Sequence, residues 1–305
     1  MSESRRGESE PLLVLVGPTA SGKTGLALDV APALAAEVLS ADSRQVYRGL
    51  DVGTAKPTRE ERERVPHHLI DLVDPGEPYD VSRYQRDADA TLGSLRARGV
   101  WPLLVGGTGL YVRAVVDGLA LVDLPHDRAL RASLEVEAAR VPAAELHARL
   151  AERDPVAAAA VHPNNVRRVV RYLEVTLLAG PVSGLWRRDG ARSARVIGLL
   201  PARPVLAARI DERVRRMVEQ GVLDETAETL RYFGDRALRA LSAHGYPHWI
   251  AYLEGRLTLD EAIRHTQRDT RAYARRQLTW FRRDPRIQWF DPERDGHALR
   301  EALRG

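Results

Sequence analysis

Short runs of apolar residues recur along the chain, and most of them end at a glycine or a polar residue. Between these runs the apolar positions are spaced as on one face of a helix, as in residues 24–36. Continuous apolar runs of this length are typical of parallel strands that are buried on both faces. Helices that alternate with such strands favour a parallel sheet flanked by helices, so we predict an α/β fold. The predicted strands are residues 11–16, 37–41, 101–105 and 195–200.

Residues 121–190 have a different pattern. They are rich in Ala, Arg and Glu, their apolar positions have helical spacing, and no run among them suits a strand. Several prolines divide the segment into short helices. We therefore predict a small all-helical insertion domain at 121–190, within a core formed by residues 9–120 and 191–305. From residue 204 onward the core is expected to be mostly helical.

The composition excludes several classes of protein. No apolar run approaches the roughly 18–20 residues that a transmembrane helix needs, and the first ten residues lack the apolar centre of a signal peptide. The chain contains no cysteine, which excludes disulfides and thiolate metal sites. We expect a cytoplasmic protein without a membrane partner. Because no feature implies a protein partner, a monomer is the simplest assembly.

The stretch GPTASGKT follows the first predicted strand and fits the phosphate-loop pattern G-x-x-x-x-G-K-[ST] at every fixed position. It therefore predicts a core like that of P-loop NTPases, in which backbone N–H groups and a helix N-terminus hold phosphate oxygens. Lys23 would reach the terminal phosphate oxygens, and the Thr24 hydroxyl would bind Mg²⁺. The expected phosphate-binding residues are Gly17, Pro18, Thr19, Ala20, Ser21, Gly22, Lys23 and Thr24.

Lysine is rare in this chain. Of 46 basic residues only Lys23 and Lys56 are lysines, so arginine supplies positive charge almost everywhere else. A lysine that persists in such a sequence indicates a place where a compact ammonium fits and a planar guanidinium does not. A loop that wraps around phosphate oxygens is such a place.

Two polar side chains follow other predicted strands and should face the same crevice, because ligands of open parallel sheets bind beyond the carboxyl ends of the strands. Asp42 could hold a metal-bound water or act as a general base, or it could cap a helix or a turn. Thr108, in the glycine-rich stretch GGTGLY, could cap the next helix or donate its hydroxyl to a phosphate oxygen. Arg213, between Arg209 and Arg216 at helical spacing, could fold over the phosphates.

The C-terminal region is basic and aromatic. Residues 264–286 contain eight arginines and two aspartates, and Trp280 lies among them. Such a stripe suits a nucleic-acid backbone with unstacked bases, although it could also be a solvated helix face. A second basic cluster lies in the predicted insertion at Arg167, Arg168 and Arg171. Two basic surfaces beside one phosphate site suggest a long polyanionic substrate.

At this point the sequence resembles one family over nearly its full length, the tRNA dimethylallyltransferases of the bacterial type. The resemblance lies in GPTASGKT (17–24), SADSRQVYRGLDVGTAKP (40–57), HHLID (67–71), GGTGLY (106–111), HPNNVRRVVRYLEV (162–175), RIDERVRRMVEQG (209–221) and TRAYARRQLTWFRR (270–283). The phosphate loop is common to many families, whereas the second and last of these blocks, in this order, are highly specific. The chain departs from the family pattern at 241–249, on both sides of the Gly-Tyr pair, where Pro247 and His248 are unusual for the family and bear on the local tRNA contacts.

The resemblance implies transfer of a dimethylallyl group from dimethylallyl diphosphate to the exocyclic amine of the tRNA adenosine next to the anticodon on its 3′ side. The phosphate loop would then hold the diphosphate of the prenyl donor rather than ATP. Asp42 would be the base, Thr108 would bind the leaving oxygen, and Lys23, Arg213 and Mg²⁺ would neutralise the leaving group. The residues implied in tRNA binding are Asp42, Ser43, Arg44, Gln45, Arg131, Arg167, Arg168, Arg171, Arg275, Arg276 and Gln277.

Three other functions agree with parts of the sequence. A small-molecule kinase could use the same loop with Asp42 as its base, but it has no use for the stripe of arginines and aromatic residues. A prenyltransferase acting on free adenylate would not need two basic surfaces. A non-catalytic RNA-binding module would not need Lys23 and Thr24 in a complete phosphate loop.

Overall fold

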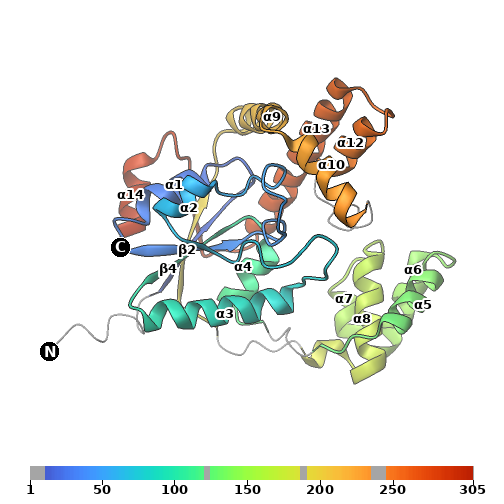
Figure 1. Cartoon of the computed structure of the whole chain (residues 1–305). Coiled ribbons are helices and arrows are strands. Elements are labelled where there is room, and N and C mark those ends of the chain that lie inside the picture. The colour runs from blue at the N-terminus through green and yellow to red at the C-terminus, as the bar shows by residue number, and fades with distance from the viewer. Residues whose placement is uncertain (1–10, 120–123, 186–190, 235–244, 305) are drawn as a thin grey trace. The chain divides into compact units, whose positions relative to one another are not determined.

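The computed structural model describes residues 11–119, 124–185, 191–234 and 245–304 (Figure 1). The chain divides into two compact units. The core unit consists of Met1–Val116 and Arg192–Gly305, and the insertion unit is Asp117–Ala191. Each unit has its own buried apolar cluster or clusters, so each is described by itself.

The core unit is built on one six-stranded parallel sheet with the strand order β3-β2-β4-β1-β5-β6. The strands are β1 (Leu12–Val16), β2 (Ala36–Ala41), β3 (His67–His68), β4 (Trp101–Gly106), β5 (Ala194–Leu199) and β6 (Ile287–Phe290). The predicted α/β fold is confirmed, and the four predicted strands are present with bounds within one residue of those expected. The prediction lacks the edge strands β3 and β6, because strands of two and four residues carry no extended apolar run.

Helices cover both faces of this sheet, as its continuous apolar strands require. The helices of the core unit are α1 (Lys23–Val30), α2 (Arg59–Arg64), α3 (Val81–Ala97), α4 (Gly109–Val116), α9 (Arg203–Glu219), α10 (Val222–Phe233), α12 (Tyr246–Leu253), α13 (Leu259–Phe281) and α14 (Gly296–Arg304). Alternate residues of β1 point to opposite faces. Leu12 and Val14 join a buried cluster with α3 and α4, whereas Leu13 and Leu15 join one with α1 and α14, on the other side of the sheet in Figure 1.

The first helix is shorter than the sequence predicts. A helix over residues 24–36 is expected, but α1 ends at Val30 and β2 begins at Ala36. Pro32 explains the difference, because proline has no N–H to donate to the Leu28 carbonyl and its ring crowds the preceding turn. The chain therefore leaves the helix at this point and returns to the sheet.

Helices α9, α10, α12 and α13 pack against segments that follow the strands. One buried cluster joins Val46 and Leu50, which follow β2, to Val214, Tyr246 and Trp249 of these helices. A smaller cluster joins the loop after β1 to α9 and α13; it consists of Ala20, Leu206, Ile210 and Ala274. The C-terminal helices are thus held beside the carboxyl ends of the strands, where open parallel sheets bind their ligands.

The regular elements among the described residues of the insertion unit are the helices α5 (Arg128–Ala138), α6 (Ala143–Arg153), α7 (Pro155–Ala159) and α8 (Val166–Ala179) and a 3₁₀ turn at Val182–Leu185. Leu134, Leu146, Leu150 and Leu173 lie at the centre of its core and are nearly inaccessible to solvent. Across the parts of the chain that the structure describes, no helix has the length and apolar character needed to cross a membrane.

Candidate functional site

The loop between β1 and α1 carries the phosphate-loop sequence. Gly17 has a φ of +148°, and a Cβ atom there would lie 2.5 Å from the Leu199 carbonyl oxygen, so the position requires glycine. Gly22, with a φ of +96°, directs the chain into α1, which begins at Lys23. The N-terminal end of this helix therefore faces the loop and favours an anion there.

Lys23 supplies a partly desolvated cation to this loop. Its Nζ donates to the Pro18 carbonyl at 2.7 Å and to the Gly17 carbonyl at 3.0 Å. Burial lowers the pKa of Lys23 to about 7, and the positive charge of Arg213 contributes to this, while Asp42 acts in the opposite direction. An anion bound in the loop would stabilise the charged form of Lys23 and raise its pKa again.

Arg213 brings a second cation from α9. Its guanidinium donates to the Thr19 hydroxyl at 3.3 Å. Burial lowers the pKa of Arg213, and the neighbouring Arg216 lowers it further. Two cations from different elements therefore converge on the same loop.

These groups line a cavity of about 150 Å³ in the core unit. The predicted site residues that line it are Thr19, Ala20, Ser21, Gly22, Lys23, Thr24, Asp42, Gln45, Arg213 and Gln277. Gly17, Pro18, Ser43, Arg44 and Thr108 are not among the lining residues. Among the described residues that line the cavity, Lys23 and Arg213 are the basic ones apart from His67, and Asp42 is the acidic one. The cavity thus has an excess of positive charge and suits an anionic ligand.

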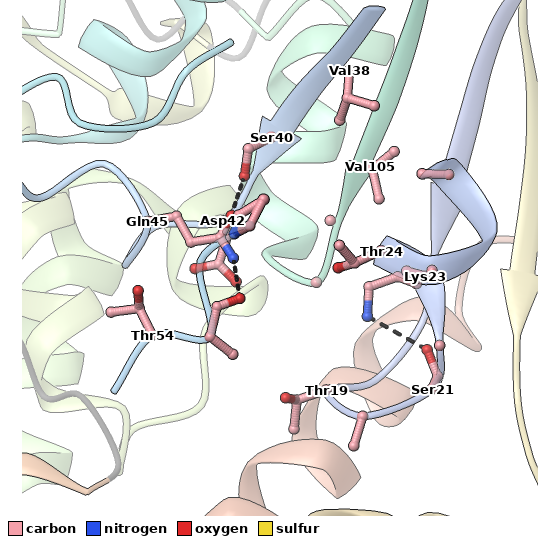
Figure 2. A pocket seen from close by; sticks show the side chains of 18 of the residues that line it. Thr19, Ser21, Lys23, Thr24, Val38, Ser40, Asp42, Gln45, Thr54 and Val105 are labelled. Atoms are coloured by element: carbon pink, nitrogen blue, oxygen red, sulfur yellow. Dashed lines mark hydrogen bonds between the residues drawn. The ribbon is translucent and has the colours of Figure 1, made fainter. Parts of the chain in front are cut away.

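Asp42 and Gln45 lie across this cavity from the phosphate loop, as Figure 2 shows. The Asp42 Oδ1 atom accepts the Arg44 N–H at 2.8 Å, so Asp42 does cap a turn. Its Oδ2 atom has no hydrogen-bond partner within the described parts of the chain. One carboxylate oxygen therefore fixes the turn, and the other can act on a ligand.

Both polar atoms of the Gln45 side-chain amide form hydrogen bonds. The Ser40 hydroxyl donates to its Oε1 at 2.9 Å, and its Nε2 donates to the Ala55 carbonyl at 3.2 Å. The side chain therefore ties the Asp42 turn to the segment around Ala55, which also lines the cavity with Thr54 and Pro57.

Thr108 forms hydrogen bonds to the turn that contains Asp42. Its Oγ1 accepts the Ser43 N–H at 3.0 Å and lies 3.4 Å from the Ser43 hydroxyl. A hydrogen bond also links Thr108 with Tyr273, whose pKa burial raises to about 12. The Thr108 carbonyl accepts the Tyr111 N–H at the start of α4. The backbone of Thr108 therefore takes part in the start of this helix, while its hydroxyl binds the turn that contains Asp42.

Gln277, expected among the tRNA contacts, is buried on α13. Its Oε1 accepts the Thr19 N–H at 2.8 Å, and its Nε2 donates to the Gly107 carbonyl at 2.9 Å. The side chain therefore fastens the phosphate loop to the end of β4. The sequence contains a signal for this burial, since Ala274, Gln277 and Phe281 lie at i, i+3 and i+7 on the buried stripe of α13.

The exposed side of α13 carries the basic stripe. Arg275 and Arg276 are exposed and line a shallow groove with Trp280 and Arg283. Arg271, also in the stripe, pairs instead with Asp211. Arg271 is therefore held by a carboxylate, whereas Arg275 and Arg276 remain exposed.

In the insertion unit, Glu174 organises part of the second basic cluster. Its carboxylate is inaccessible to solvent and accepts from Arg131 at 2.6 Å, from Arg171 at 2.8 Å and from His126 at 2.7 Å. Burial by itself would raise the pKa of Glu174, but hydrogen bonds from these groups and from the Asp127 N–H hold it at about 2. Arg131 and Arg171 are therefore fixed in orientation, whereas Arg167 and Arg168 are exposed.

Several histidines of the core unit form contacts with nearby residues. His67 hydrogen-bonds the Val65 carbonyl, and His68 pairs with Glu37 at 2.6 Å. His248, in the region that departs from the family pattern, pairs with Asp269 at 2.9 Å; residues 241–244 lie outside the described residues. No three His, Cys, Asp or Glu side chains gather as metal ligands within the described residues.

Comparisons with known proteins agree over most of the chain. Residues 45–284 match the family described as IPP transferase, and residues 11–71 match the family described as isopentenyl transferase. The chain is 50% identical over 293 residues to a tRNA dimethylallyltransferase of Anaeromyxobacter sp. (strain K), covering 94% of this chain and 95% of that relative. It is 45% identical to the tRNA dimethylallyltransferase of Carboxydothermus hydrogenoformans, covering 93% and 92%.

Solved structures resemble the chain in the same way. The tRNA isopentenylpyrophosphate transferase of Bacillus halodurans has a TM-score of 0.70 and 43% identity, covering 97% of this chain and 95% of that one. A eukaryotic dimethylallyltransferase described as acting on tRNA has a TM-score of 0.81 and 26% identity, covering 97% and 78%.

Proposed function

We infer the reaction from one premise: the chain belongs to the tRNA dimethylallyltransferase family, and it is therefore a prenyltransferase. We propose that it transfers the dimethylallyl group of dimethylallyl diphosphate to the exocyclic amine of the tRNA adenosine next to the anticodon on its 3′ side. The observation that carries this proposal is the cavity in which two cations of the phosphate-loop side face the Asp42 carboxylate.

The phosphate-loop side stabilises the leaving diphosphate. Lys23, Arg213 and the N–H groups at the start of α1 supply positive charge where negative charge develops as the bond to the prenyl carbon breaks. These groups are partly desolvated, which strengthens their interaction with the anion. Removal of one such contact is expected to slow transfer about 100- to 1000-fold.

Asp42 and Thr108 act on the reacting atoms. An adenine amine is a weak nucleophile because its lone pair is delocalised into the ring, so the site must hold it in line with the prenyl carbon. The amine nitrogen bonds to this carbon while the bond to the diphosphate oxygen breaks and its electron pair leaves with diphosphate. The amine proton passes to Asp42. Thr108 Oγ1 accepts the Ser43 N–H and donates to the Ser43 hydroxyl at 3.4 Å, and in the reaction this proton would turn from that long bond to the leaving oxygen.

A divalent metal fits this oxygen-rich cavity, and we propose Mg²⁺. Thr24, Ser40 and Asp42 line the same cavity and offer oxygen donors, the ligands that Mg²⁺ prefers. Thr24 would hold the ion together with diphosphate oxygens, and the bound ion would neutralise part of the charge on the leaving group.

We propose that the tRNA meets both basic surfaces. Arg275 and Arg276 of α13 would contact the sugar-phosphate backbone of the tRNA near the cavity. The target nucleotide would be contacted by the turn of residues Asp42, Ser43, Arg44 and Gln45. Gln277 would support this arrangement from its buried position rather than touch the tRNA. Because tRNA is found in the cytoplasm, we propose that the protein acts there, as a monomer.

In the insertion unit, whose functional limits we propose at 121–190, Arg167 and Arg168 would bind the anticodon stem-loop. Arg131 and Arg171, held by Glu174, would present fixed guanidinium edges to the same RNA. Contacts of this kind release counterions, so tRNA affinity should fall steeply as the salt concentration rises. A flat response to salt would argue against these surfaces as the docking site.

One assay separates this function from its alternatives. The protein is incubated with Mg²⁺, labelled dimethylallyl diphosphate and either unmodified tRNA or AMP. Label is expected in tRNA and not in AMP, and Asp42→Asn should abolish transfer while the variant still binds the donor. Label in AMP alone would indicate the free-adenylate enzyme. Label in neither substrate would refute prenyl transfer.

A further inference from the structure

We propose that Lys56, the second lysine of the chain, is a positioning residue that holds one wall of the cavity in place for the acceptor nucleotide. The proposal rests on the function proposed above. The wall consists of Thr54, Ala55 and Pro57, which line the cavity beside Gln45. Lys56 lies within this segment but points away from the cavity.

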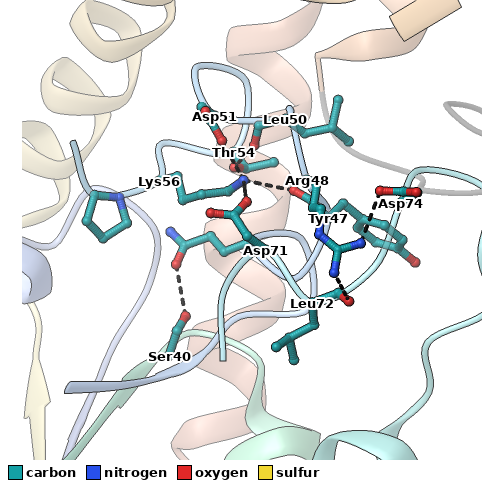
Figure 3. Close-up of polar contacts among 12 residues, drawn as sticks. Ser40, Tyr47, Arg48, Leu50, Asp51, Thr54, Lys56, Asp71, Leu72 and Asp74 are labelled. Carbon is teal, nitrogen blue, oxygen red and sulfur yellow. Dashed lines mark hydrogen bonds and ion pairs between the residues drawn. The ribbon is translucent and has the colours of Figure 1, made fainter. Parts of the chain in front are cut away.

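Lys56 is enclosed by three oxygen atoms, as Figure 3 shows. Its Nζ donates to the Tyr47 carbonyl at 2.8 Å, to Asp51 Oδ1 at 2.5 Å and to Asp71 Oδ1 at 2.6 Å. The Lys56 side chain has 0% exposure, and Arg62 pairs with the other oxygen of Asp71 at 2.8 Å. The ammonium therefore joins Tyr47 and Asp51, in the segment that follows β2, to Asp71, which follows β3.

This geometry explains why the position holds lysine in a chain that otherwise uses arginine. An ammonium has three protons, and the enclosure offers three acceptors in a compact arrangement. A guanidinium is larger and planar, and its five donors form a rigid fork that matches paired carboxylate oxygens. Arginine at position 56 would need more space and a different set of acceptors.

The wall that Lys56 holds is a tight turn with its own constraints. The Lys56 N–H donates to the Asp51 carbonyl at 2.9 Å, which closes the turn. Ala55 adopts a left-handed φ of +49°, a conformation that alanine adopts only when its surroundings impose it. The Ala55 carbonyl accepts from Gln45, so the position of the turn sets the position of a side chain in the cavity.

Glu225 of α10 secures the same turn from its other end. Its carboxylate accepts the N–H groups of Asp51, Val52 and Gly53 at 2.6, 2.7 and 2.9 Å. The Tyr246 hydroxyl donates to Glu225 at 2.6 Å. The turn is thus held between an anion on α10 and the cation of Lys56. Without the cation, Asp51 and Asp71 would repel each other and the wall would move.

The test compares three variants. Lys56→Met removes the cation at similar size, and Lys56→Arg keeps the charge in a group that does not fit the enclosure. Arg62→Met is the control for a partly exposed cation at the same wall, because Arg62 is 30% exposed, shares Asp71 and donates to the Pro57 carbonyl at 2.8 Å. Titration calorimetry with dimethylallyl diphosphate counts donor sites and gives the donor Kd. Single-turnover transfer to saturating tRNA is then expressed per donor site.

Both Lys56 variants should bind the donor with a Kd within about twofold of the native value, while the rate per donor site falls at least ~10-fold because the acceptor is misplaced. Arg62→Met should stay within about threefold of the native rate, as a partly exposed pair contributes less than the enclosed ammonium. If the Lys56 variants lose donor sites but keep the native rate per site, the residue is merely structural and the inference is overturned. Full activity in Lys56→Arg would also overturn it.

A second measurement separates this inference from the proposed function. Amide hydrogen exchange at Asp51, Val52 and Gly53 reports on the turn whether or not tRNA is a substrate. Exchange should be faster in Lys56→Met than in Arg62→Met, and equal exchange in the two variants would overturn the inference. A native protein that transfers no label to tRNA but shows this difference would refute the proposed function alone.

Discussion

Binding of a diphosphate at the phosphate loop should take up a proton, because Lys23 is partly neutral before the ligand arrives. Burial, together with the charge of Arg213, lowers the pKa of Lys23 to about 7 from its usual value of 10.5. A bound diphosphate favours the charged ammonium and raises this pKa again. Above a pH of about 7, the free protein therefore lacks a proton that the complex holds.

The size of the effect follows from the pKa of the free protein. With a value of about 7, roughly 0.1 proton is taken up at a pH of about 6, roughly 0.5 at about 7 and roughly 0.9 at about 8. The sign is fixed, since a depressed lysine pKa that rises on binding makes affinity fall as pH rises. Each pH unit above about 7 should weaken binding by about tenfold, or ~1.4 kcal/mol.

Titration calorimetry measures this uptake directly. The binding enthalpy is determined in buffers with different ionisation enthalpies, and the slope gives the number of protons. A substituted phosphate loses its last proton near a pH of about 6, so at about 8 the ligand contributes little. Lys23→Met is the control, because methionine has no titrating group, so this variant should bind more weakly and without proton uptake.

Two results would refute this reasoning. If the native chain takes up no proton at a pH of about 8, Lys23 is already charged in the free protein and burial does not shift its pKa as described. If Lys23→Met takes up the same proton as the native chain, another group is responsible.

Three further changes have defined outcomes. Gln277→Leu leaves a buried N–H and a buried carbonyl unpaired and should cost about 1–3 kcal/mol for each, which denaturant unfolding measures against the exposed Arg276→Ala; equal stability of the two variants would contradict the bridge. Thr108→Ala should slow single-turnover transfer about 100-fold with tRNA affinity unchanged, and a native rate would exclude its assigned role. Glu174 has a pKa of about 2, below its usual value of 4.5, so its stabilisation is present above about 4.5 and is lost as pH falls through this range. Glu174→Gln should therefore lower the melting temperature strongly at neutral pH and less at a pH of about 3, where the folded protein still holds the charge, and an equal loss at both would show that the charge is not the cause.

The sequence predicts the elements whose signal lies within a short stretch of the chain, such as the four long strands. The four long strands have continuous apolar runs, because both of their faces are buried whatever the rest of the chain does. The edge strands β3 and β6 have no such signal, since each forms on a neighbour that is already in place. The end of α1 at Val30 was predictable from Pro32 alone.

The residues of the site also differ in whether a local sequence pattern could predict their roles. The phosphate loop carries its own pattern because its geometry is local, and Gly17 is required by a single close contact. The role of Gln277 depends on a hydrogen bond to Thr19 across 258 positions of sequence, which no local pattern contains. The pairing of Arg171 with Glu174, in contrast, lies at i and i+3 on one helix and was open to prediction.

The presence of only two lysines has a practical consequence for handling this protein. Amine-reactive dyes and sensor surfaces attack uncharged amines; Lys56 is enclosed and ion-paired, whereas Lys23 has a pKa of about 7. Coupling through amines will therefore attach the protein by its N-terminus or by Lys23 in the cavity. Protection of Lys23 from acylation can serve as a footprint for bound diphosphate. Immobilisation is better achieved through an introduced surface cysteine, which would be the single thiol in the chain.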